Sequence, residues 1–418
     1  MSKLLIQHTG EPIHVRLQIG GSKSISNRVL IMNALSHESQ TIHNLSDSDD
    51  TQTLLGLLKN FKSGESQTYD AHHAGTTFRF MTAFLAMQSG AQVLTGSDRM
   101  KQRPIGPLVL ALREIGADIS YLEKEGYPPL KIGSFNGQKN DTISIRSDIS
   151  SQFLSALCMI APTLDKGLTI NFIGDPVSGP YLQMTLDLMK AFGIDSQVID
   201  KGVQISNQAY KSQAYTVESD WSSASYHYAI AAIAREAHIE LEYFKPNSLQ
   251  ADAAIQDFCN QFGVHSSLEN NILTIKSVDK YHSKIQHDFL SHPDIAQTIS
   301  AICAAKNLEI DFKGLKTLFI KETDRVAAMT EELSKVGVAI VSSTEEGFEY
   351  SQSGHLRIDL PTFETYQDHR MAMCLAPLAL LGPIEIRHPK VVNKSYPNFW
   401  KDLEALGFTL TFDSPLDS

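Results

Sequence analysis

Five segments of the chain share one pattern of apolar and polar positions. In each, apolar residues recur at helical spacing, a glycine follows, and a short alternating run comes next. A glycine directly after a helix is the usual left-handed cap, and alternation with β-branched residues indicates a strand. We therefore predict a helix end, a glycine cap and a strand within residues 112–121, 188–199, 258–268, 333–343 and 403–412.

The spacing of the capping glycines indicates a structural repeat. Gly116, Gly193, Gly263, Gly337 and Gly407 follow one another at intervals of 77, 70, 74 and 70 residues. A degenerate first copy lies at residues 54–69, without a clean cap. A length of 418 residues holds about six units of about 70 residues, so we predict six similar α/β units. Any α/β protein has helix–glycine–strand junctions, and the spacing by itself says nothing of chemistry.

Composition excludes several classes of protein. Apolar residues at 42% and charged residues at 20% are typical of a globular chain, and no stretch approaches the roughly 18 apolar residues that cross a bilayer. The N-terminus lacks the apolar core of a signal peptide. The four cysteines lack metal-ligand spacing, and three stand in apolar runs. We expect a cytoplasmic protein, without a transit peptide and therefore bacterial.

The net charge of −11 argues against a nucleic-acid or acidic-membrane partner, so an anion site needs a local cluster of cations. The segment GGSKSISNR, residues 20–28, is one candidate. Ser22 stands where a nucleotide P-loop needs glycine, which excludes that motif. Hydroxyl groups and Lys23 at a helix start nevertheless suit an anion.

Comparable sets precede other apolar runs. They are HHAGTTFR (72–79), RMKQRP (99–104), SDISSQF (147–153), VSGPY (177–181), HPD (292–294), KETDR (321–325) and DHR (368–370). Each alone is explained by an ordinary helix cap or a solvated loop. Together they indicate helix N-termini that converge and concentrate positive potential in one cleft.

The sequence resembles the 5-enolpyruvylshikimate-3-phosphate synthases nearly from end to end. The resemblance rests on these motifs in order: GSKSISNR, DSDDT, AGTTFR, RMKQRPIGPL, YPPL, SSQFLSAL, SGPYLQMTLDLMKAFG, SSASY, PDIAQT, KETDRVAAM, DHRMAM and NKSYPNFW. It implies an α/β, two-domain enolpyruvyl transferase fold of six βαβαββ units, three per domain, in an inside-out, barrel-like arrangement. The first domain would hold residues 1–21 and 222–418 and the second residues 22–221, with the active site in the cleft between them.

The implied reaction transfers the enolpyruvyl group of phosphoenolpyruvate to the 5-hydroxyl of shikimate 3-phosphate and releases phosphate, on the route to chorismate. It proceeds by addition and elimination through a tetrahedral intermediate. The resemblance implies no metal and no organic cofactor, and these two small molecules as the only partners. We expect a monomer, because two domains bury a sufficient core.

The resemblance also implies roles at matching positions. Lys23, Asp294 and Glu322 match proton-transfer groups, and Lys23 and Asp294 also face substrate. Positions that match the phosphoenolpyruvate site are Gly75, Arg103, Arg325, Arg370 and Lys394. Positions that match contacts with shikimate 3-phosphate are Ser24, Arg28, Ser150, Ser151, Gln152, Ser178, Tyr181 and Lys321.

Some positions depart from the family pattern. His72 and His73 stand where Gly-Asn is usual, Gly20 replaces a proline, Thr317 replaces an asparagine, and SDR replaces DER before the basic loop. Two alternatives remain. A transferase acting on UDP-N-acetylglucosamine would carry a loop cysteine near residues 97–103, where there is none. A non-catalytic paralogue that binds anions would lack a proton-transfer group, whereas Lys23, Asp294 and Glu322 are all present.

Overall fold

The computed structural model describes residues 2–146, 150–174, 179–341, 351–353 and 356–413. The chain divides into two compact units. Unit 1 comprises Met1–Gly20 and Glu218–Ser418, and unit 2 comprises Gly21–Val217. No helix in the described part of the chain is long and apolar enough to cross a membrane.

The junctions differ by a few residues from the boundaries expected from the sequence, which placed Gly21 in the first domain and residues 218–221 in the second. Backbone contacts explain where residues 218–221 lie. The Asp220 amide donates to the Gly20 carbonyl at 3.1 Å, and the Ser219 hydroxyl donates to the Glu242 carbonyl at 2.8 Å. These bonds attach Ser219 and Asp220, where the chain returns from unit 2, to unit 1.

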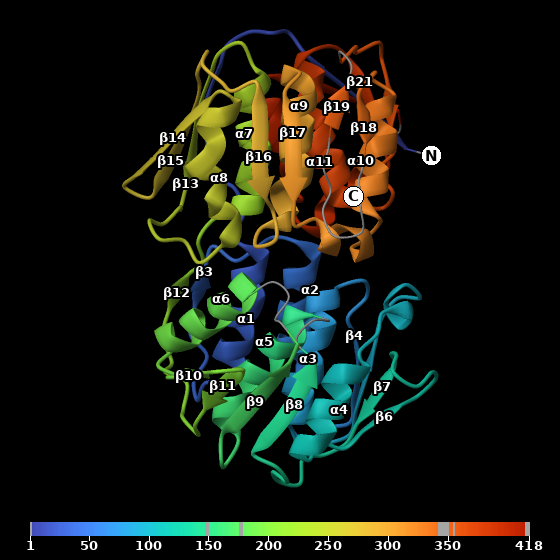
Figure 1. Cartoon of the computed structure of the whole chain (residues 1–418). Helices are drawn as coiled ribbons and strands as arrows, with labels where there is room; N and C mark the ends of the chain where they lie inside the picture. Colours follow the sequence, from blue (N-terminus) through green and yellow to red (C-terminus); the bar gives the residue numbers. More distant parts are fainter. Residues whose placement is uncertain (1, 147–149, 175–178, 342–350, 354–355, 414–418) are drawn as a thin grey trace. The chain divides into compact units, whose positions relative to one another are not determined.

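Within its described residues, unit 2 contains two four-stranded sheets, a two-stranded pair and six helices (Figure 1). The first sheet has the order β4 (Gln67–Asp70), β5 (Gln92–Thr95), β7 (Leu130–Ile132), β6 (Ile119–Tyr121). The second has the order β8 (Thr142–Arg146), β9 (Leu168–Ile173), β11 (Gly202–Ile205), β10 (Gln197–Ile199), and β3 (Ile42–His43) pairs with β12 (Tyr215–Thr216). The helices are α1 (Lys23–Leu35), α2 (Asp49–Asn60), α3 (Gly75–Ala86), α4 (Gly106–Ile115), α5 (Ser151–Ile160) and α6 (Gly179–Ala191), with 3-10 turns η1 (Met100–Gln102) and η2 (Ala161–Thr163).

Unit 1 repeats this plan. One sheet has the order β2 (Ile13–Leu17), β13 (Ala237–Glu242), β15 (Ile272–Ser277), β14 (Val264–Glu269), and another the order β20 (Thr362–Phe363), β21 (Ile384–Arg387), β1 (Lys3–His8), β22 (Phe408–Phe412). Two strand pairs join β16 (Lys284–Asp288) to β17 (Glu309–Lys313) and β18 (Ala339–Val341) to β19 (Ser351–Ser353). The helices are α7 (Trp221–Ile233), α8 (Ile255–Phe258), α9 (Ala296–Lys306), α10 (Arg325–Ser334), α11 (His369–Leu375) and α12 (Phe399–Ala405). The 3-10 turns are η3 (Ala251–Ala254), η4 (Cys259–Phe262), η5 (Pro293–Ile295), η6 (Lys316–Ile320), η7 (Ala376–Leu380) and η8 (Pro389–Lys394).

All four of the four-stranded sheets have the same strand pattern. Each begins with a parallel pair, and the remaining two strands continue it antiparallel. The sheet of β20 and β21 takes its third strand, β1, from the other end of the chain. In the described chain these sheets are open, and none closes into a barrel. The barrel-like arrangement that the resemblance implies therefore refers only to the layers of helices and sheets.

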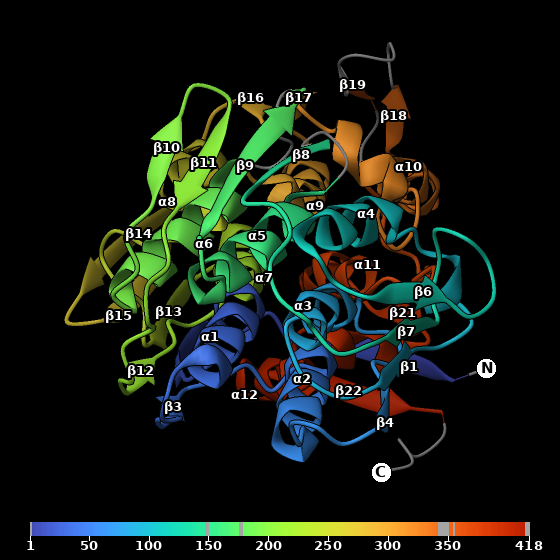
Figure 2. The ribbon, with the colours of Figure 1, turned by 90° about the horizontal axis from the view of Figure 1, so that it is seen from below.

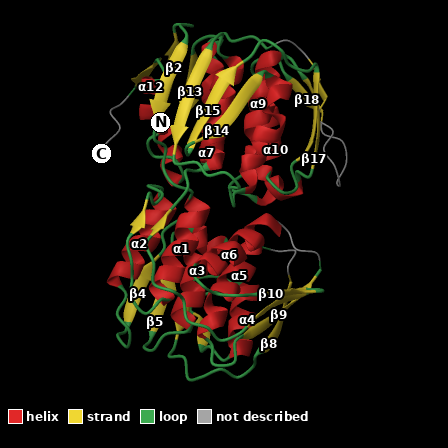
Figure 3. Ribbon diagram, turned by 90° about the vertical axis from the view of Figure 1, so that its left-hand side faces the viewer, coloured by secondary structure: helices red, strands yellow, loops and turns green. Residues whose placement is uncertain are grey.

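Helices fill the centre of each unit, and the sheets lie outside them. In unit 1, α7, α9 and α11 pack against one another, and nearly all their side chains are buried. In unit 2, α1, α3, α5 and α6 make the corresponding contacts (Figure 2). Figure 3 shows the sheet of β2 and β13–β15 along one side of its unit. Central helices place their N-termini near one another, which positions the groups described below.

The predicted capping glycines do adopt left-handed backbone. Gly116, Gly193, Gly263, Gly337 and Gly407 all have φ between 81° and 126°. Each lies shortly after a helix or 3-10 turn and shortly before a strand: Gly263 and Gly407 precede their strands directly, and connections of one to three residues follow Gly116, Gly193 and Gly337. A side chain at these φ values is strained, so glycine lets the chain leave each helix and enter the sheet.

Candidate functional site

Arg325 holds three carboxylates of unit 1 together at the start of α10. Its guanidinium lies 2.7 Å from Asp368 Oδ2, 3.0 Å from Asp294 Oδ1 and 2.8 Å from Glu322 Oε2. The side chain is only 2% exposed. A buried guanidinium with its fork filled by carboxylates keeps a fixed orientation, so Arg325 fixes the relative placement of Asp294 and Glu322.

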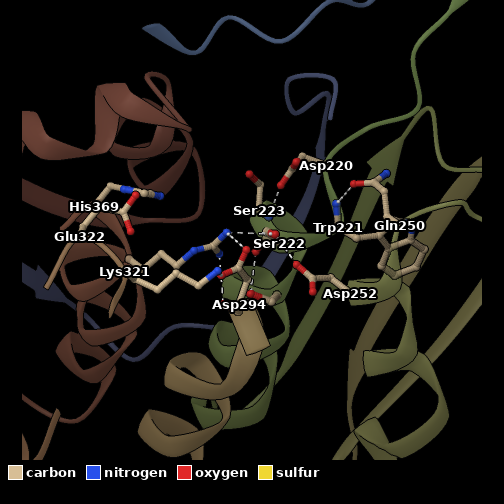
Figure 4. Close-up of polar contacts among 12 residues, drawn as sticks. Asp220, Trp221, Ser222, Ser223, Gln250, Asp252, Asp294, Lys321, Glu322 and His369 are labelled. Atoms are coloured by element: carbon tan, nitrogen blue, oxygen red, sulfur yellow. Dashed lines mark hydrogen bonds and ion pairs between the residues drawn. The ribbon is translucent and has the colours of Figure 1, made fainter. Parts of the chain in front are cut away.

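Asp294 lies on the one-turn η5, between cations from two other elements. Arg370 approaches its Oδ2 at 3.0 Å. Lys321, drawn beside Asp294 in Figure 4, approaches its Oδ1 at 3.8 Å. Burial raises the pKa of Asp294, but Arg370, Lys321 and Arg325 outweigh burial and hold that pKa well below its ordinary value. Asp294 is therefore ionised at every pH at which the protein would work.

Glu322 is the second carboxylate of this group. Lys394, at the end of η8, lies 2.8 Å from its Oε1. Burial raises the pKa of Glu322, yet Arg325 and Lys394 lower it well below the ordinary value. The structure thus brings together all six site residues that the sequence predicted in unit 1, namely Asp294, Lys321, Glu322, Arg325, Arg370 and Lys394.

Unit 2 contains a buried cation held by neutral oxygens. Arg28, 2% exposed, donates to Thr185 Oγ1 at 2.7 Å and Ser155 Oγ at 3.1 Å, and to the carbonyls of Ser24 and Tyr181. Burial lowers the pKa of Arg28 to about 10. Within the described residues no carboxylate forms an ion pair with it, so its charge adds positive potential to this part of unit 2. All these contacts of Arg28 are within the protein, so its contact with substrate stays a prediction.

Lys23 is the first residue of α1, where the helix dipole disfavours a cation. The neighbouring Ser22 hydroxyl is buried without a hydrogen-bond partner among the described residues. Ser24, half-buried, follows on the same turn. A cation without an ion pair and a hydroxyl without a partner, both judged within the described residues, suit an anion at a helix start.

Gly75 and Arg103 lie against each other. A Cβ at Gly75 would overlap the Arg103 guanidinium, so glycine is required for this contact. Arg79 donates to Gln152 Oε1, and Gln152 Nε2 donates to Thr76 Oγ1 at 3.1 Å. This orients the predicted site residue Gln152 at the start of α5.

The remaining predicted residues of unit 2 differ in what the structure assigns to them. Ser150 caps α5 by accepting from the Gln152 amide at 3.3 Å, and Ser151 is the first residue of that helix. Tyr181, in the first turn of α6, uses its carbonyl for Arg28 and Thr185. Ser178 lies outside the described residues.

Three departures from the family pattern, His72, His73 and Thr317, have exposed or unsatisfied side chains. His72 and His73 approach Asp70 and Asp49 at 3.4 and 3.6 Å, with side chains more than half exposed. The Thr317 hydroxyl is buried and has no hydrogen-bond partner among the described residues.

Comparison with known proteins identifies the family. Residues 7–403 match the model of EPSP synthase (3-phosphoshikimate 1-carboxyvinyltransferase). The chain is 41% identical over 400 residues to 3-phosphoshikimate 1-carboxyvinyltransferase of Bacteroides fragilis, covering 95% of this chain and 96% of that protein. It is 36% identical over 434 residues to the enzyme of the same name from Aliivibrio salmonicida, covering 97% and 100%.

The chain belongs to the EPSP synthase family. Its fold is also that of two solved proteins. EPSP synthase from Acinetobacter baumannii superposes with a TM-score of 0.81 at 20% identity, over 99% of this chain and 100% of that one. The enolpyruvyl transferase NikO from Streptomyces tendae gives a TM-score of 0.70 at 13% identity, over 98% and 99%.

Three residues that adjoin Arg325 and Arg370, namely Asp368, Ser222 and Asp252, were not predicted from the sequence as site residues of this EPSP synthase family chain. Asp368 caps α11 through the Arg370 amide at 2.9 Å and also binds Arg325. Ser222 Oγ lies 3.3 Å from Arg370 and donates to Asp252. The sequence signals Asp368 through its position before His369-Arg370, but nothing around Asp252 marks it. No group of three or more His, Cys, Asp or Glu within the described residues could hold a metal.

Proposed function

We propose that this protein transfers the enolpyruvyl group of phosphoenolpyruvate to the 5-hydroxyl of shikimate 3-phosphate and releases phosphate. Family membership over nearly the whole chain supports this activity. The structural observation that carries the proposal is the pair Asp294 and Glu322, two carboxylates held by one guanidinium among further cations. Such a group can bind anionic substrates and transfer protons in one place.

The reaction needs two proton transfers of opposite direction. The 5-hydroxyl loses a proton as it attacks C2 of phosphoenolpyruvate, and the methylene carbon gains one. The tetrahedral adduct then loses phosphate and the added methyl proton. We assign Asp294 to removal of the hydroxyl proton and Lys23 to donation of a proton to the methylene carbon. Glu322 is assigned to removal of the methyl proton when the adduct loses phosphate. Both carboxylates are ionised, and the general base for the hydroxyl must be so before attack.

Substrate binding would make Asp294 a better base. Arg370 and Lys321 hold the pKa of Asp294 low while their charges face it. An anionic substrate that pairs with the same two cations weakens their effect on Asp294, and its own negative charge raises the carboxylate's pKa further. We infer that the affinity of Asp294 for a proton increases when substrate is present.

The remaining assignments follow the charges. Arg103, Arg325, Arg370 and Lys394, together with Gly75, are assigned to the carboxylate and phosphate of phosphoenolpyruvate. We assign Lys23, Ser24, Arg28, Ser150, Ser151, Gln152, Ser178, Tyr181 and Lys321 to shikimate 3-phosphate. The reaction as written needs no metal or organic cofactor. We further infer a monomer that acts in the cytoplasm, for which four buried free cysteines are suited.

The test measures phosphate release from phosphoenolpyruvate with shikimate 3-phosphate as acceptor, beside UDP-N-acetylglucosamine as control. Release with shikimate 3-phosphate alone is expected. D294N should lower kcat by roughly 10²–10⁴-fold, the usual contribution of a general base, while shikimate 3-phosphate still binds.

D324N is the matched control, because Asp324 is a nearby acid that only caps α10 and asparagine caps equally well. Release with the sugar nucleotide instead, or wild-type turnover by D294N, would contradict the proposal.

A further inference from the structure

Asp252 is a buried carboxyl beside the charged group of unit 1. It lies on η3, is 4% exposed, and accepts a hydrogen bond at Oδ2 from the Ser222 hydroxyl. Its Oδ1 has no hydrogen-bond partner among the described residues. A buried carboxyl with only half of its acceptors used is costly, so stability alone gives it little reason to be there.

Ser222 connects this carboxyl to Arg370. Its Oγ lies 3.3 Å from Arg370 Nη2, and the same Nη2 lies 3.0 Å from Asp294 Oδ2. Figure 4 shows Ser222 beside Asp252. A serine hydroxyl has one hydrogen to donate and lone pairs that accept. Because that hydrogen goes to Asp252, the lone pairs of Ser222 face Arg370, whose N–H donates to them.

We propose that Asp252 is a positioning residue for the transfer reaction. By accepting the Ser222 hydrogen, it keeps the hydroxyl oriented as an acceptor and thereby fixes the guanidinium of Arg370 against Asp294. Asp252 itself does not contact substrate. The inference rests on the proposed function, because its consequence is the placement of Arg370 for phosphoenolpyruvate.

The other contacts of Arg370 show what the Ser222 contact adds to the orientation of its guanidinium. Nη1 donates to the Asp294 carbonyl at 3.1 Å and lies 3.4 Å from the Tyr226 hydroxyl. These contacts, with that to Asp294 Oδ2, lie on the η5 and α7 sides, and Ser222 adds a second donor–acceptor pair on Nη2. Loss of the Ser222 contact would remove one of the acceptors that hold Nη2 in place, and another of them, Asp294, must itself react.

The charges around Asp252 support an acceptor role above neutral pH. Burial and the neighbouring Asp294 raise the pKa of Asp252 to about 7, while Arg370 and the Ser222 hydrogen bond oppose the rise and Asp220 adds to it. Asp294 stays ionised under the same conditions. The two carboxyls therefore differ in role, and at pH 8 Asp252 is mostly an ionised acceptor.

The test compares D252L, D252N and S222A by steady-state kinetics at pH 8. We expect D252L and S222A each to raise the KM for phosphoenolpyruvate by about tenfold, which is the loss of about 1.4 kcal/mol of binding. The KM for shikimate 3-phosphate should change less than about threefold. D252N keeps an acceptor for Ser222 and should restore a KM near that of wild type.

Coupling between the two positions decides the matter. In the double variant D252L/S222A the increase should equal that of either single variant, because both remove one link. Three outcomes would each overturn the proposal. The increases in KM for phosphoenolpyruvate could multiply in the double variant, the KM could be unchanged in D252L and S222A, or D252N could raise the KM as much as D252L. S222A leaves the buried carboxyl in place, so it tests the link even if D252L does not fold.

D257N is the matched control, because Asp257 is an exposed acid five residues further along and outside this group. It should retain both KM values. If wild type itself releases no phosphate with shikimate 3-phosphate, the proposed function fails. If wild type is active and D252L has the same KM values as wild type, only the role of Asp252 fails.

Discussion

At the scale of single residues, Gly75 shows how one missing side chain shapes a site. A Cβ there would overlap the guanidinium of Arg103, so G75A must displace that cation. We expect the KM for phosphoenolpyruvate to rise by about tenfold or more, about 1.4 kcal/mol, with a smaller change for shikimate 3-phosphate. Steady-state kinetics with each substrate varied in turn would measure this.

G56A is the control for this change. Gly56 lies inside α2, and a Cβ there meets no atom within 4 Å. Alanine should leave both KM values unchanged and stabilise the helix by up to about 1 kcal/mol. If G75A and G56A gave the same kinetics, the contact between Gly75 and Arg103 would have no functional weight.

At the scale of elements, two helix caps of the same residue type should differ in their contribution to stability. Asp324 caps α10 by accepting from the Ala327 amide at 3.0 Å, at the surface. Asp368 caps α11 but is fully buried and also binds Arg325 at 2.7 Å. We expect D324A to lower the free energy of unfolding by about 1 kcal/mol and D368A by about 3–5 kcal/mol.

Chemical denaturation of the two variants beside wild type measures the difference. D368A removes one anion from Arg325 and leaves that buried guanidinium with fewer partners, which is the source of the larger loss. Equal losses would mean that both aspartates act as caps alone.

At the scale of the whole molecule, the repeat of helix, glycine and strand could be predicted because its signals are local. The glycines at φ near 80° to 126° stand where the pattern placed them. Motifs also indicated the helix starts that carry Asp294, Arg325 and Arg370. What could not be predicted depends on which helices are neighbours in space. Asp252 is linked to Arg370 through Ser222 because α7 packs against both η3 and α11, and no spacing in the sequence indicates that packing.

A histidine in the core of unit 1 should contribute less to the stability of the whole molecule as the pH falls into the mildly acid range. His227 is 1% exposed, and burial lowers its pKa to about 4. Its Nε2 lies 3.1 Å from the Tyr396 hydroxyl, which donates to Asp402, so Nε2 carries the hydrogen. Nδ1 has no hydrogen-bond partner among the described residues, and a proton placed there would be buried without an acceptor.

The unfolded chain takes up this proton near pH 6.5, but the folded chain does so only near pH 4. The contribution of neutral His227 is therefore complete above about pH 6.5 and is lost as the pH falls towards 4, by about 3 kcal/mol in all. Denaturation of wild type and H227Q between pH 7 and 4 should give free energies of unfolding whose difference shrinks by this amount as the pH falls.

Asp252, whose raised pKa acts in the opposite direction, cancels in the difference between the two proteins. H265Q changes an exposed histidine and should run parallel to wild type. Parallel curves for H227Q would mean that the core of unit 1 accepts the charged ring.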